Sequence, residues 1–456
     1  MLTPLLCLIA LAAPQAPAPI TARLAKTLSA PMLKPGIVGM RVVSLETGKL
    51  LFERNSEKSL MPASNMKIVT CSAALALLGP GFVYTTGVYS VGEDLILKGS
   101  GDPSLDFARL QKLAAAVKAA GVTELKGKLL YDATVFDAEA LGEGWQWDDE
   151  EFYYSAQVSG LSCDENVAVV IVKPGAVGEA PLVETTPYFT VENKAVTTDG
   201  KEQALSVSRK RGQNIVVVTG KLGDKADAKR TTLTIEDPAR FTALRFTEAL
   251  RGAGVSVPET IVLEAGKLPK EAVALTVSSS APLSKLAADF MKPSDNLFGE
   301  CFLKTLGAIK GKTGSAAEGA KVVREWLKSR SIPTTGFYQA DGSGLSRMNL
   351  VTAQLLMGIL RDRAGDSNFR AAMPIGGVDG TLKNRFKKMP AQNNVRAKTG
   401  TLTGASSLSG YVTTKAGERL AFSILMNHYD RVGGASSVRA LQDALVLTLL
   451  DVPRRR

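Results

Sequence analysis

The sequence predicts an α+β fold in which an antiparallel sheet packs with helices and a second α+β region is inserted into the chain. Near the start, residues 37–44 and 50–52 alternate apolar and polar side chains around a turn at 46–48, which is typical of a β-hairpin. Near the end, residues 407–413 and 420–426 predict two more strands joined by a turn. Strand patterns at both ends, with helix patterns between them, are the main evidence for this fold class.

Helices are predicted where apolar residues recur on one face and where glycine or proline marks an end. Outside the middle of the chain they cover residues 22–33, 68–78, 283–291, 297–306, 320–328, 352–361 and 437–450. The helix at 68–78 is almost wholly apolar and stops at Gly79-Pro80, so we expect it to be buried.

The middle of the chain, from about residue 84 to residue 276, differs in character. Short strand patterns alternate there with glycine, proline and charged turns, and helix patterns lie at 106–120 and 238–253. The strand patterns cover residues 86–89, 95–97, 128–132, 167–172, 214–219 and 231–235. We therefore expect an inserted region, 85–276, made of two small subdomains, and one split domain made of residues 21–84 and 277–456.

Length and charge exclude several classes of protein. A chain of 456 residues can hold two or three domains with a large core. The net charge of +11 is spread along the chain, with no basic block except Arg454-Arg455-Arg456 and no interleaved aromatic residues, so we expect no nucleic-acid partner. The charge indicates an ordinary solvated surface, with mild attraction to anionic cell-wall polymers as a second interpretation.

Residues 1–20 have the pattern of an export signal. A short apolar core at 5–13 is followed by alanines and prolines, and Cys7 lies inside that core rather than at a lipoprotein site. The core is too short to span a bilayer, and no later stretch approaches spanning length without charges. The sequence therefore predicts a periplasmic or otherwise extracytoplasmic protein with no transmembrane segment.

The histidine and cysteine counts limit the possible chemistry. His428 is the only histidine, which disfavours a zinc hydrolase, and no G-x-S-x-G motif would complete a serine triad with it. We expect His428 in a turn or on the surface near the end of a strand. Cys71, Cys163 and Cys301 allow one disulfide at most, and their apolar surroundings predict buried thiols. We expect no metal and no cofactor.

The candidate nucleophile lies at the start of the apolar helix, in Pro62-Ala63-Ser64-Asn65-Met66-Lys67. A lysine three residues after a serine lies one helical turn further along the same face. A partly desolvated lysine can remove the serine proton, and backbone N–H groups at a helix start can hold an oxyanion. Taken alone, the stretch also fits an ordinary capped helix with a solvated lysine.

Two later stretches favour the catalytic interpretation. Ser294-Asp295-Asn296 follows a predicted helix, and Lys398-Thr399-Gly400 opens a strand-like run. S-x-x-K, S-D-N and K-T-G in this order form the motif set of serine penicillin-binding proteins and class A β-lactamases. Because histidine is nearly absent, a lysine is the best available base for Ser64.

The mature chain resembles, almost end to end, the low-molecular-mass penicillin-binding proteins of the D-alanyl-D-alanine carboxypeptidase/endopeptidase type. Like them, it has a large insertion, since 230 residues separate Ser64 from Ser294. Further similar segments are residues 101–105, 144–149, 341–347 and 377–382. The resemblance implies a transpeptidase/β-lactamase-like domain with a five-stranded antiparallel sheet, in which the hairpin before Ser64 pairs with the strands after Lys398.

The resemblance implies a serine hydrolase that acts on peptidoglycan stem peptides and that β-lactams inhibit covalently. Ser64 would attack the carbonyl between two D-alanines and form an acyl-enzyme, with Lys67 as its base. Ser294 would relay the proton to the departing amine, with Lys398 nearby. Asn296 would bind either the substrate amide or Lys67.

The remaining site residues are assigned to substrate binding. Lys398 and Thr399 suit the terminal carboxylate, and Gly400 would leave the strand edge open to substrate. The backbone N–H groups of Ser64 and Thr401 would form the oxyanion hole. In this family the inserted region and the 341–347 loop help to hold the side chain of the diamino acid, which implicates Asp149 and Arg347. The alternative is that residues 148–151 form a solvated acidic turn.

Two other functions stay open from the sequence: a β-lactamase-like hydrolase and a catalytically idle wall-binding protein. The insertion argues against the first, and the intact motifs argue against the second. Carboxypeptidase and endopeptidase activity are not distinguished. Lys312-Thr313-Gly314 is a second K-T-G without a strand pattern, and Leu306 replaces the glycine that a phosphate loop needs, so we assign this stretch no role.

Overall fold

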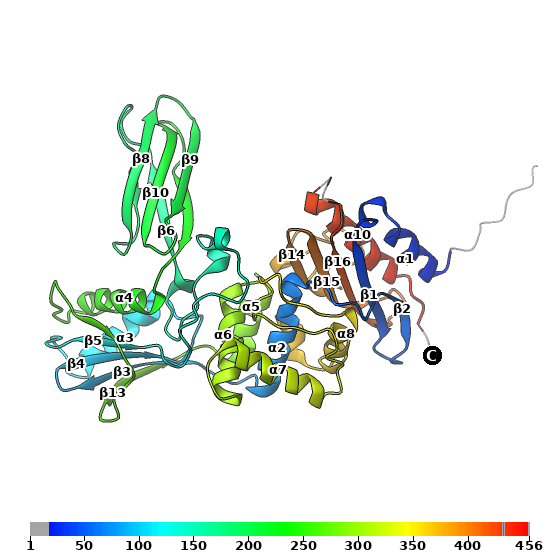
Figure 1. Ribbon diagram of the computed structural model, residues 1–456, viewed down its shortest axis with the longest axis horizontal. Helices are drawn as coiled ribbons and strands as arrows, with labels where there is room; N and C mark the ends of the chain where they lie inside the picture. Colours follow the sequence, from blue (N-terminus) through cyan, green and yellow to red (C-terminus); the bar gives the residue numbers. More distant parts are fainter. Residues whose placement is uncertain (1–17, 431, 433, 455–456) are drawn as a thin grey trace, which may run out of the picture.

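A five-stranded antiparallel sheet forms one layer of the computed structural model, which describes residues 18–430, 432 and 434–454 (Figure 1). Its strands lie in the order β14 (Arg396–Leu402), β15 (Ala405–Thr413), β16 (Arg419–Asn427), β1 (Ile37–Ser44) and β2 (Leu50–Arg54). Within the first hairpin, β1 pairs with β16 along its whole length, from Ile37 opposite Asn427 to Ser44 opposite Leu420, and β2 pairs with the other edge of β1. The expected pairing of the first hairpin with the last strands is confirmed.

Helices cover both faces of this sheet (Figure 1). On one face, α1 (Ile20–Leu28) and α10 (Gly434–Leu449) pack together against inward-facing residues such as Met40 and Phe422. The opposite face carries α2 (Met66–Leu77) and α8 (Ala353–Asp362), which meet residues such as Leu425. β16 is therefore buried on both faces, which explains its nearly continuous apolar sequence.

The helix that follows Ser64 is the centre of the helical layer. α2 contacts α8 and four further helices, α5 (Leu283–Met291), α6 (Asn296–Lys310), α7 (Ala316–Ser329) and α9 (Ser367–Ala372). All residues from Met66 to Leu75 are buried, as expected for a helix that is apolar on every side. This packing fixes the start of α2 against the sheet.

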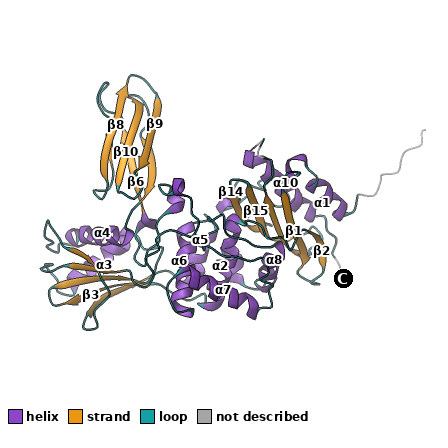
Figure 2. Cartoon of the chain, viewed as in Figure 1, coloured by secondary structure: helices purple, strands orange, loops and turns teal. Residues whose placement is uncertain are grey.

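The chain between β2 and α5 builds three more sheets, shown beside and above the helical layer in Figures 1 and 2. One has the order β12-β5-β4-β3-β13 and packs against α3 (Phe107–Ala119) and α4 (Pro238–Gly252). Its strands are β3 (Thr85–Val91), β4 (Asp94–Gly99), β5 (Leu129–Asp132), β12 (Leu263–Ala265) and β13 (Val273–Ser279).

The other two sheets have three strands each and share one apolar core that includes Val170, Val172, Val216 and Val218. The first has the order β8-β10-β9, and the second has the order β11-β6-β7. Their bounds are β6 (Val167–Lys173), β7 (Leu182–Glu184), β8 (Thr190–Thr198), β9 (Gln203–Arg209), β10 (Ile215–Gly223) and β11 (Lys229–Thr234). We call this unit, 167–234, the distal sheets.

Several local expectations have clear outcomes. His428 is exposed directly after β16, and the three cysteines are buried and free, as predicted. The helix expected at 22–33 instead ends at Leu28 and is followed by a 3-10 turn, Pro31–Leu33, because proline cannot continue the helix ladder. The expected signal, residues 1–20, lies mostly outside the described residues, since 1–17 are not described.

Within the described part of the chain, no helix is long and apolar enough to cross a membrane, and no group of histidine, cysteine or carboxylate side chains is arranged to hold a metal.

The second K-T-G lies between α6 and α7. Gly314 O accepts a hydrogen bond from Asp137 N at 3.1 Å, and a Cβ at Gly314 would lie 1.9 Å from Val135 O. Its glycine therefore serves a close backbone contact with residues 135–137.

Candidate active site

Ser64 lies in a 3-10 turn, Ala63–Asn65, directly before α2 rather than as the first residue of the α-helix. Ala63 has φ of 47°, a left-handed conformation that costs a non-glycine residue energy and needs support from its surroundings. Two bonds supply support from the sheet: Asn65 Nδ2 donates to Lys398 O at 2.9 Å, and Ser407 Oγ donates to Pro62 O at 2.6 Å. The turn is thereby fixed against β14 and β15.

Lys67 extends from the first turn of α2 into a buried polar site. Its Nζ lies 3.0 Å from Ser64 Oγ, 2.6 Å from Asn296 Oδ1 and 2.7 Å from Ser343 O. Burial lowers the pKa of Lys67 to about 8, even though nearby carboxyl groups, Asp341 foremost, favour its charged form. A neutral amine can keep two of these contacts as a donor and accept the Ser64 proton with its lone pair.

The S-D-N motif connects α5 to α6. Ser294 has φ of 69°, and Asp295 caps α6 by accepting a bond from Phe298 N at 3.1 Å. Asn296 is the first residue of α6, and its amide bridges two partners: Oδ1 accepts from Lys67, and Nδ2 donates to Tyr154 O at 2.8 Å. Lys67, one of the two partners expected for Asn296, is thus in direct contact with it.

Lys398 is fully buried on β14. Its Nζ donates to Ser294 Oγ at 2.8 Å and to Thr399 O at 3.0 Å. Burial, together with the charge of Lys67, lowers the pKa of Lys398 well below its usual value. Two lysine–serine pairs, Lys67–Ser64 and Lys398–Ser294, thus lie in one site.

The structure explains why residue 400 is a glycine. We expected glycine to leave the strand edge open for substrate. The structure gives a second reason for glycine, since a Cβ here would lie 2.2 Å from Ser407 Oγ, 2.6 Å from Pro62 O and 2.9 Å from Ser64 N. Glycine is required because the turn that contains Ser64 packs directly on β14.

A buried carboxyl group that sequence analysis missed supports the loop whose carbonyl contacts Lys67. Glu300 on α6 accepts from Gly342 N and Ser343 N, each at 2.9 Å, and the carbonyl of Ser343 in turn accepts from Lys67. Burial and Asp341 raise the pKa of Glu300 above its usual value. The available sequence signal was a single glutamate inside the apolar pattern 297–306.

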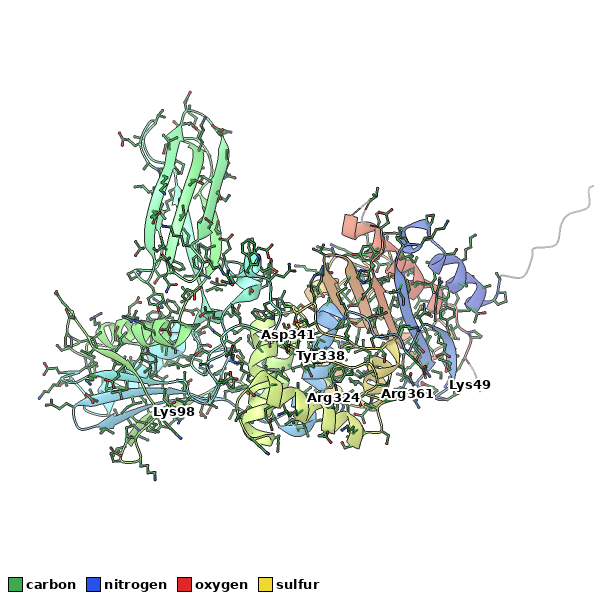
Figure 3. All side chains as sticks on the ribbon, in the orientation of Figure 1. Lys49, Lys98, Arg324, Tyr338, Asp341 and Arg361 are labelled. Carbon is green, nitrogen blue, oxygen red and sulfur yellow. The ribbon has the colours of Figure 1, made fainter. Side chains whose placement is uncertain are left out.

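Asp341 organises the adjoining loop, 341–347. It accepts from Gly344 N at 2.7 Å, from Ser346 N at 2.6 Å and from Trp145 Nε1 at 3.0 Å. Figure 3 labels Asp341 between the inserted region and the sheet. The inserted region therefore contacts the site directly through Trp145, and also through the carbonyl of Tyr154.

The site opens into a cleft of about 710 Å³. Its lining includes the motif residues Ser64, Ser294, Asn296, Thr399, Gly400 and Thr401, while Lys67 and Lys398 lie buried behind them. Thr399 Oγ1 donates to Thr381 Oγ1 at 2.8 Å. Thr381 belongs to the 377–382 segment noted in the sequence, which thus lines the cleft beside the K-T-G strand.

Asp149 and Arg347 both line the same cleft. Asp149 Oδ1 accepts from Tyr154 OH at 2.7 Å, and the Arg347 guanidinium donates to Thr403 O, with Nη1 at 2.9 Å. Asp149 is half-buried, so it does not belong to a fully solvated turn. The expected carboxylate and guanidinium are thus both within reach of a ligand in the cleft.

This fold, with a serine and two buried lysines at one cleft, defines a class: serine-type acyl-transfer enzymes of the transpeptidase-like group. Comparison with known proteins gives the family. The profile of the D-Ala-D-Ala carboxypeptidase 3 (S13) family matches residues 20–449. The chain belongs to this family, and it is a serine-type D-Ala-D-Ala carboxypeptidase, a low-molecular-mass penicillin-binding protein acting on peptidoglycan.

Individual relatives agree with this assignment. A D-alanyl-D-alanine carboxypeptidase of Actinomadura sp. (strain R39) is 37% identical over 454 residues, covering 93% of this chain and 83% of the relative. Penicillin binding protein 4 of Haemophilus influenzae superposes with a TM-score of 0.81 at 25% identity, over 93% of this chain and 98% of that one. A predatory peptidoglycan endopeptidase of Bdellovibrio bacteriovorus, with a TM-score of 0.53, 15% identity and coverage of 92% and 95%, shares the fold.

Proposed function

We propose that the enzyme cleaves the bond between two D-alanines through an acyl-enzyme on Ser64. Ser64 Oγ attacks the carbonyl, its proton passes to Lys67 Nζ, and the leaving D-alanine departs after its nitrogen is protonated. Water then attacks the ester and frees Ser64. The observation that carries this proposal is the 3.0 Å contact between Ser64 Oγ and the buried, pKa-lowered amine of Lys67.

Ser294 is the proposed proton relay to the leaving amine. It lines the cleft, and its Oγ accepts from Lys398 Nζ at 2.8 Å, so Lys398 can replace a proton that Ser294 gives up. Asn296 keeps Lys67 oriented through the 2.6 Å bond to Nζ.

The terminal carboxylate of the substrate is proposed to bind at Thr399, with Lys398 behind it. The backbone N–H groups of Ser64 and Thr401 are proposed as the oxyanion hole. Gly400 supports this arrangement because it allows β14 to approach Ser64 N closely. β-Lactams would acylate Ser64 in the same way, and one solved relative, penicillin binding protein 4 of Haemophilus influenzae, is complexed with a novel β-lactam.

Asp149 and Arg347 are proposed to hold the ammonium and carboxylate ends of the diamino-acid side chain. Their position on one cleft supports this role. Residues 21–84 and 277–456 would then form one split catalytic domain, with 85–276 contributing a cleft wall. We also propose an extracytoplasmic location, where this substrate is found.

Product analysis tests the proposed function. A pentapeptide with a diamino acid should release D-alanine, and Asp149→Asn should raise its KM by about tenfold, because one charge-assisted contact is lost. A matched peptide with an uncharged side chain should respond less than twofold. No D-alanine release by the wild type would contradict the activity, and equal effects on both peptides would contradict the role of Asp149. Cleavage of a cross-linked dimer in the same assay would reveal endopeptidase activity.

A further inference from the structure

Residues 145–155 form the part of the inserted region that lines the cleft. The side of this segment that faces away from the cleft contacts the distal sheets. Thr234 Oγ1 donates to Glu150 O at 2.5 Å, and Thr234 N donates to Glu151 O at 3.2 Å. Arg209 adds two bonds, from its backbone N to Glu151 Oε2 at 2.8 Å and from Nη2 to Glu150 O at 3.2 Å. Residues 150 and 151 are therefore fixed by the ends of β9 and β11.

Arg209 is the centre of this contact. Its side chain is 1% exposed, forms an ion pair with Glu236 at 2.5 Å, and donates to Thr234 Oγ1 at 3.1 Å and to Gln213 O at 3.0 Å. A buried guanidinium with so many acceptors has one favoured geometry, because each lost bond would leave a desolvated donor or charge.

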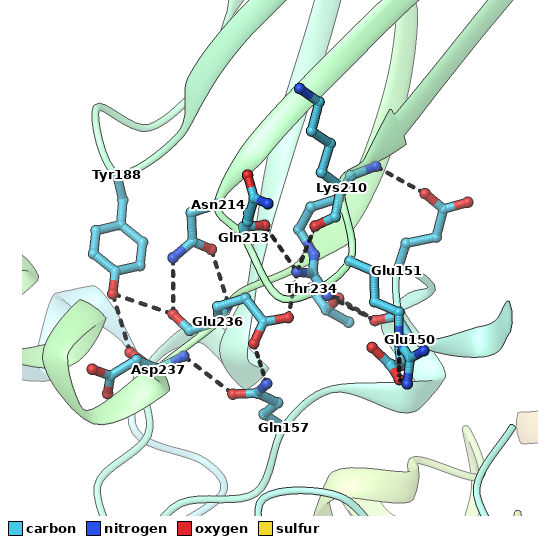
Figure 4. Close-up of polar contacts among 12 residues, drawn as sticks. Glu150, Glu151, Gln157, Tyr188, Lys210, Gln213, Asn214, Thr234, Glu236 and Asp237 are labelled. Carbon is cyan, nitrogen blue, oxygen red and sulfur yellow. Dashed lines mark hydrogen bonds and ion pairs between the residues drawn. The ribbon is translucent and has the colours of Figure 1, made fainter. Parts of the chain in front are cut away.

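Glu236 extends the same contact toward the C-terminal end of the segment. Gln157 Nε2 donates to Glu236 Oε2 at 2.5 Å, and Gln157 Oε1 accepts from Asp237 N at 3.1 Å. Asn214 Nδ2 and Tyr188 OH both donate to Glu236 O, and Figure 4 shows this group around Glu236. The segment is thus held at residues 150–151, and the chain two residues beyond its end is held at Gln157.

The inner side of the segment faces the reaction site. Asp149, Tyr153 and Tyr154 line the cleft. Tyr154 OH donates to Asp149, and Tyr154 O accepts from Asn296. Asn296 is also fixed independently, as the first residue of α6 and as a partner of Lys67. A shift of residues 149–154 would therefore disturb Asp149 more than the catalytic lysine.

We propose that Arg209 is a positioning residue that holds residues 149–154 where a bulky, charged substrate side chain can bind. This inference rests on the proposed function of Asp149. The distal sheets, which contain none of the three motifs, thereby contribute to substrate specificity without touching the substrate.

The test compares Arg209→Met with the wild type on three probes. For the diamino-acid pentapeptide we expect KM to rise by about tenfold with kcat within twofold, since a misplaced binding group weakens capture. The peptide with an uncharged side chain and acylation by benzylpenicillin should change less than twofold. Arg209→Lys, which keeps the charge but not the planar fork, should give an intermediate KM.

Two further variants keep the result interpretable. Arg109→Met breaks another largely buried ion pair, with Asp102 at 2.6 Å, and the side chains of this pair bond within residues 102–109. It should lower thermal stability without raising KM. Thr234→Val is nearly isosteric and removes two hydrogen bonds, the one from Thr234 Oγ1 to Glu150 O and the one from Arg209 to Thr234 Oγ1. This variant tests the same contact if Arg209→Met does not fold.

An unchanged KM in both Arg209→Met and Thr234→Val would overturn the inference, as would equal losses on all three probes. Asp149→Asn separates the two claims. If it raises the KM of the charged peptide while the Arg209 and Thr234 variants do not, the positioning role alone fails. If Asp149→Asn has no effect, the proposed role of Asp149 and this inference both fail.

Discussion

Replacing Lys67 by methionine is expected to lower the rate of Ser64 acylation by about 10²–10⁴-fold, the usual contribution of a general base. Methionine fills the buried volume without a proton acceptor, so Ser64 Oγ would lose its base at 3.0 Å. The measurement is the rate of covalent labelling by a fluorescent penicillin, followed under single-turnover conditions. Lys312→Met in the second, exposed K-T-G is the matched control and should stay within twofold.

The pH dependence of acylation follows from the same lysine. An amine can accept the Ser64 proton only in its neutral form, and the pKa of Lys67 is lowered to about 8. Below that pH the acylation rate should rise about tenfold per pH unit, and above it the rate should level off. A flat profile from pH 6 to 9, or normal labelling of Lys67→Met, would contradict the assignment of Lys67 as the base.

Replacing Lys398 by alanine is expected to lower kcat/KM for a substrate with a free terminal carboxylate by about 10- to 150-fold. A charge-assisted contact contributes roughly 1.5–3 kcal/mol, which corresponds to that range. The control is the same peptide with its carboxylate amidated, which should lose little further rate. Equal losses for both peptides would contradict the carboxylate role and leave Lys398 acting through Ser294, to which its Nζ donates at 2.8 Å.

The lowered pKa of Lys398 gives this prediction a second readout. In the free enzyme burial favours the neutral amine, whereas a bound carboxylate favours the ammonium. Between the two pKa values binding takes up a proton, so affinity for a free-acid inhibitor should fall as pH rises, by at most tenfold per unit. The amidated inhibitor should lack this slope, and binding calorimetry in buffers of different ionisation enthalpy can measure the proton uptake.

The fold class and the main strands could be predicted because each has a local pattern. The hairpin at residues 37–52 and the apolar run of β16 are legible from alternation and continuous hydrophobicity. β8 and β9 were missed because only one side of each meets the small distal core, and polar residues such as Thr190, Glu192 and Gln203 dilute the pattern. Short β7 and β12 carry too few residues to form one.

For the site, the motifs identified the side chains but not their arrangement. Spacing placed Lys67 beside Ser64. The bridge from Lys67 through Asn296 to Tyr154 O could not be predicted in this way, because Lys67 and Asn296 are 229 positions apart and Asn296 and Tyr154 are 142 apart. The left-handed backbone of Ser294 has no sequence signature, because serine there looks like any loop residue. Glu300 was missed because it lies in an apolar helix. A carboxyl group is expected at such a position only when tertiary partners hold it, and the sequence does not show those partners.

The most direct test of the central claim, Ser64 as the acylated nucleophile, is peptide mass spectrometry of the enzyme after brief reaction with benzylpenicillin. The proposed mechanism predicts one penicilloyl adduct, on the peptide that contains Ser64, and none in Ser64→Ala folded to wild-type circular dichroism. Ser294→Ala should still carry the adduct on Ser64, formed more slowly. An adduct on Ser294 or any other residue of the wild type, or undiminished labelling of Ser64→Ala, would contradict it.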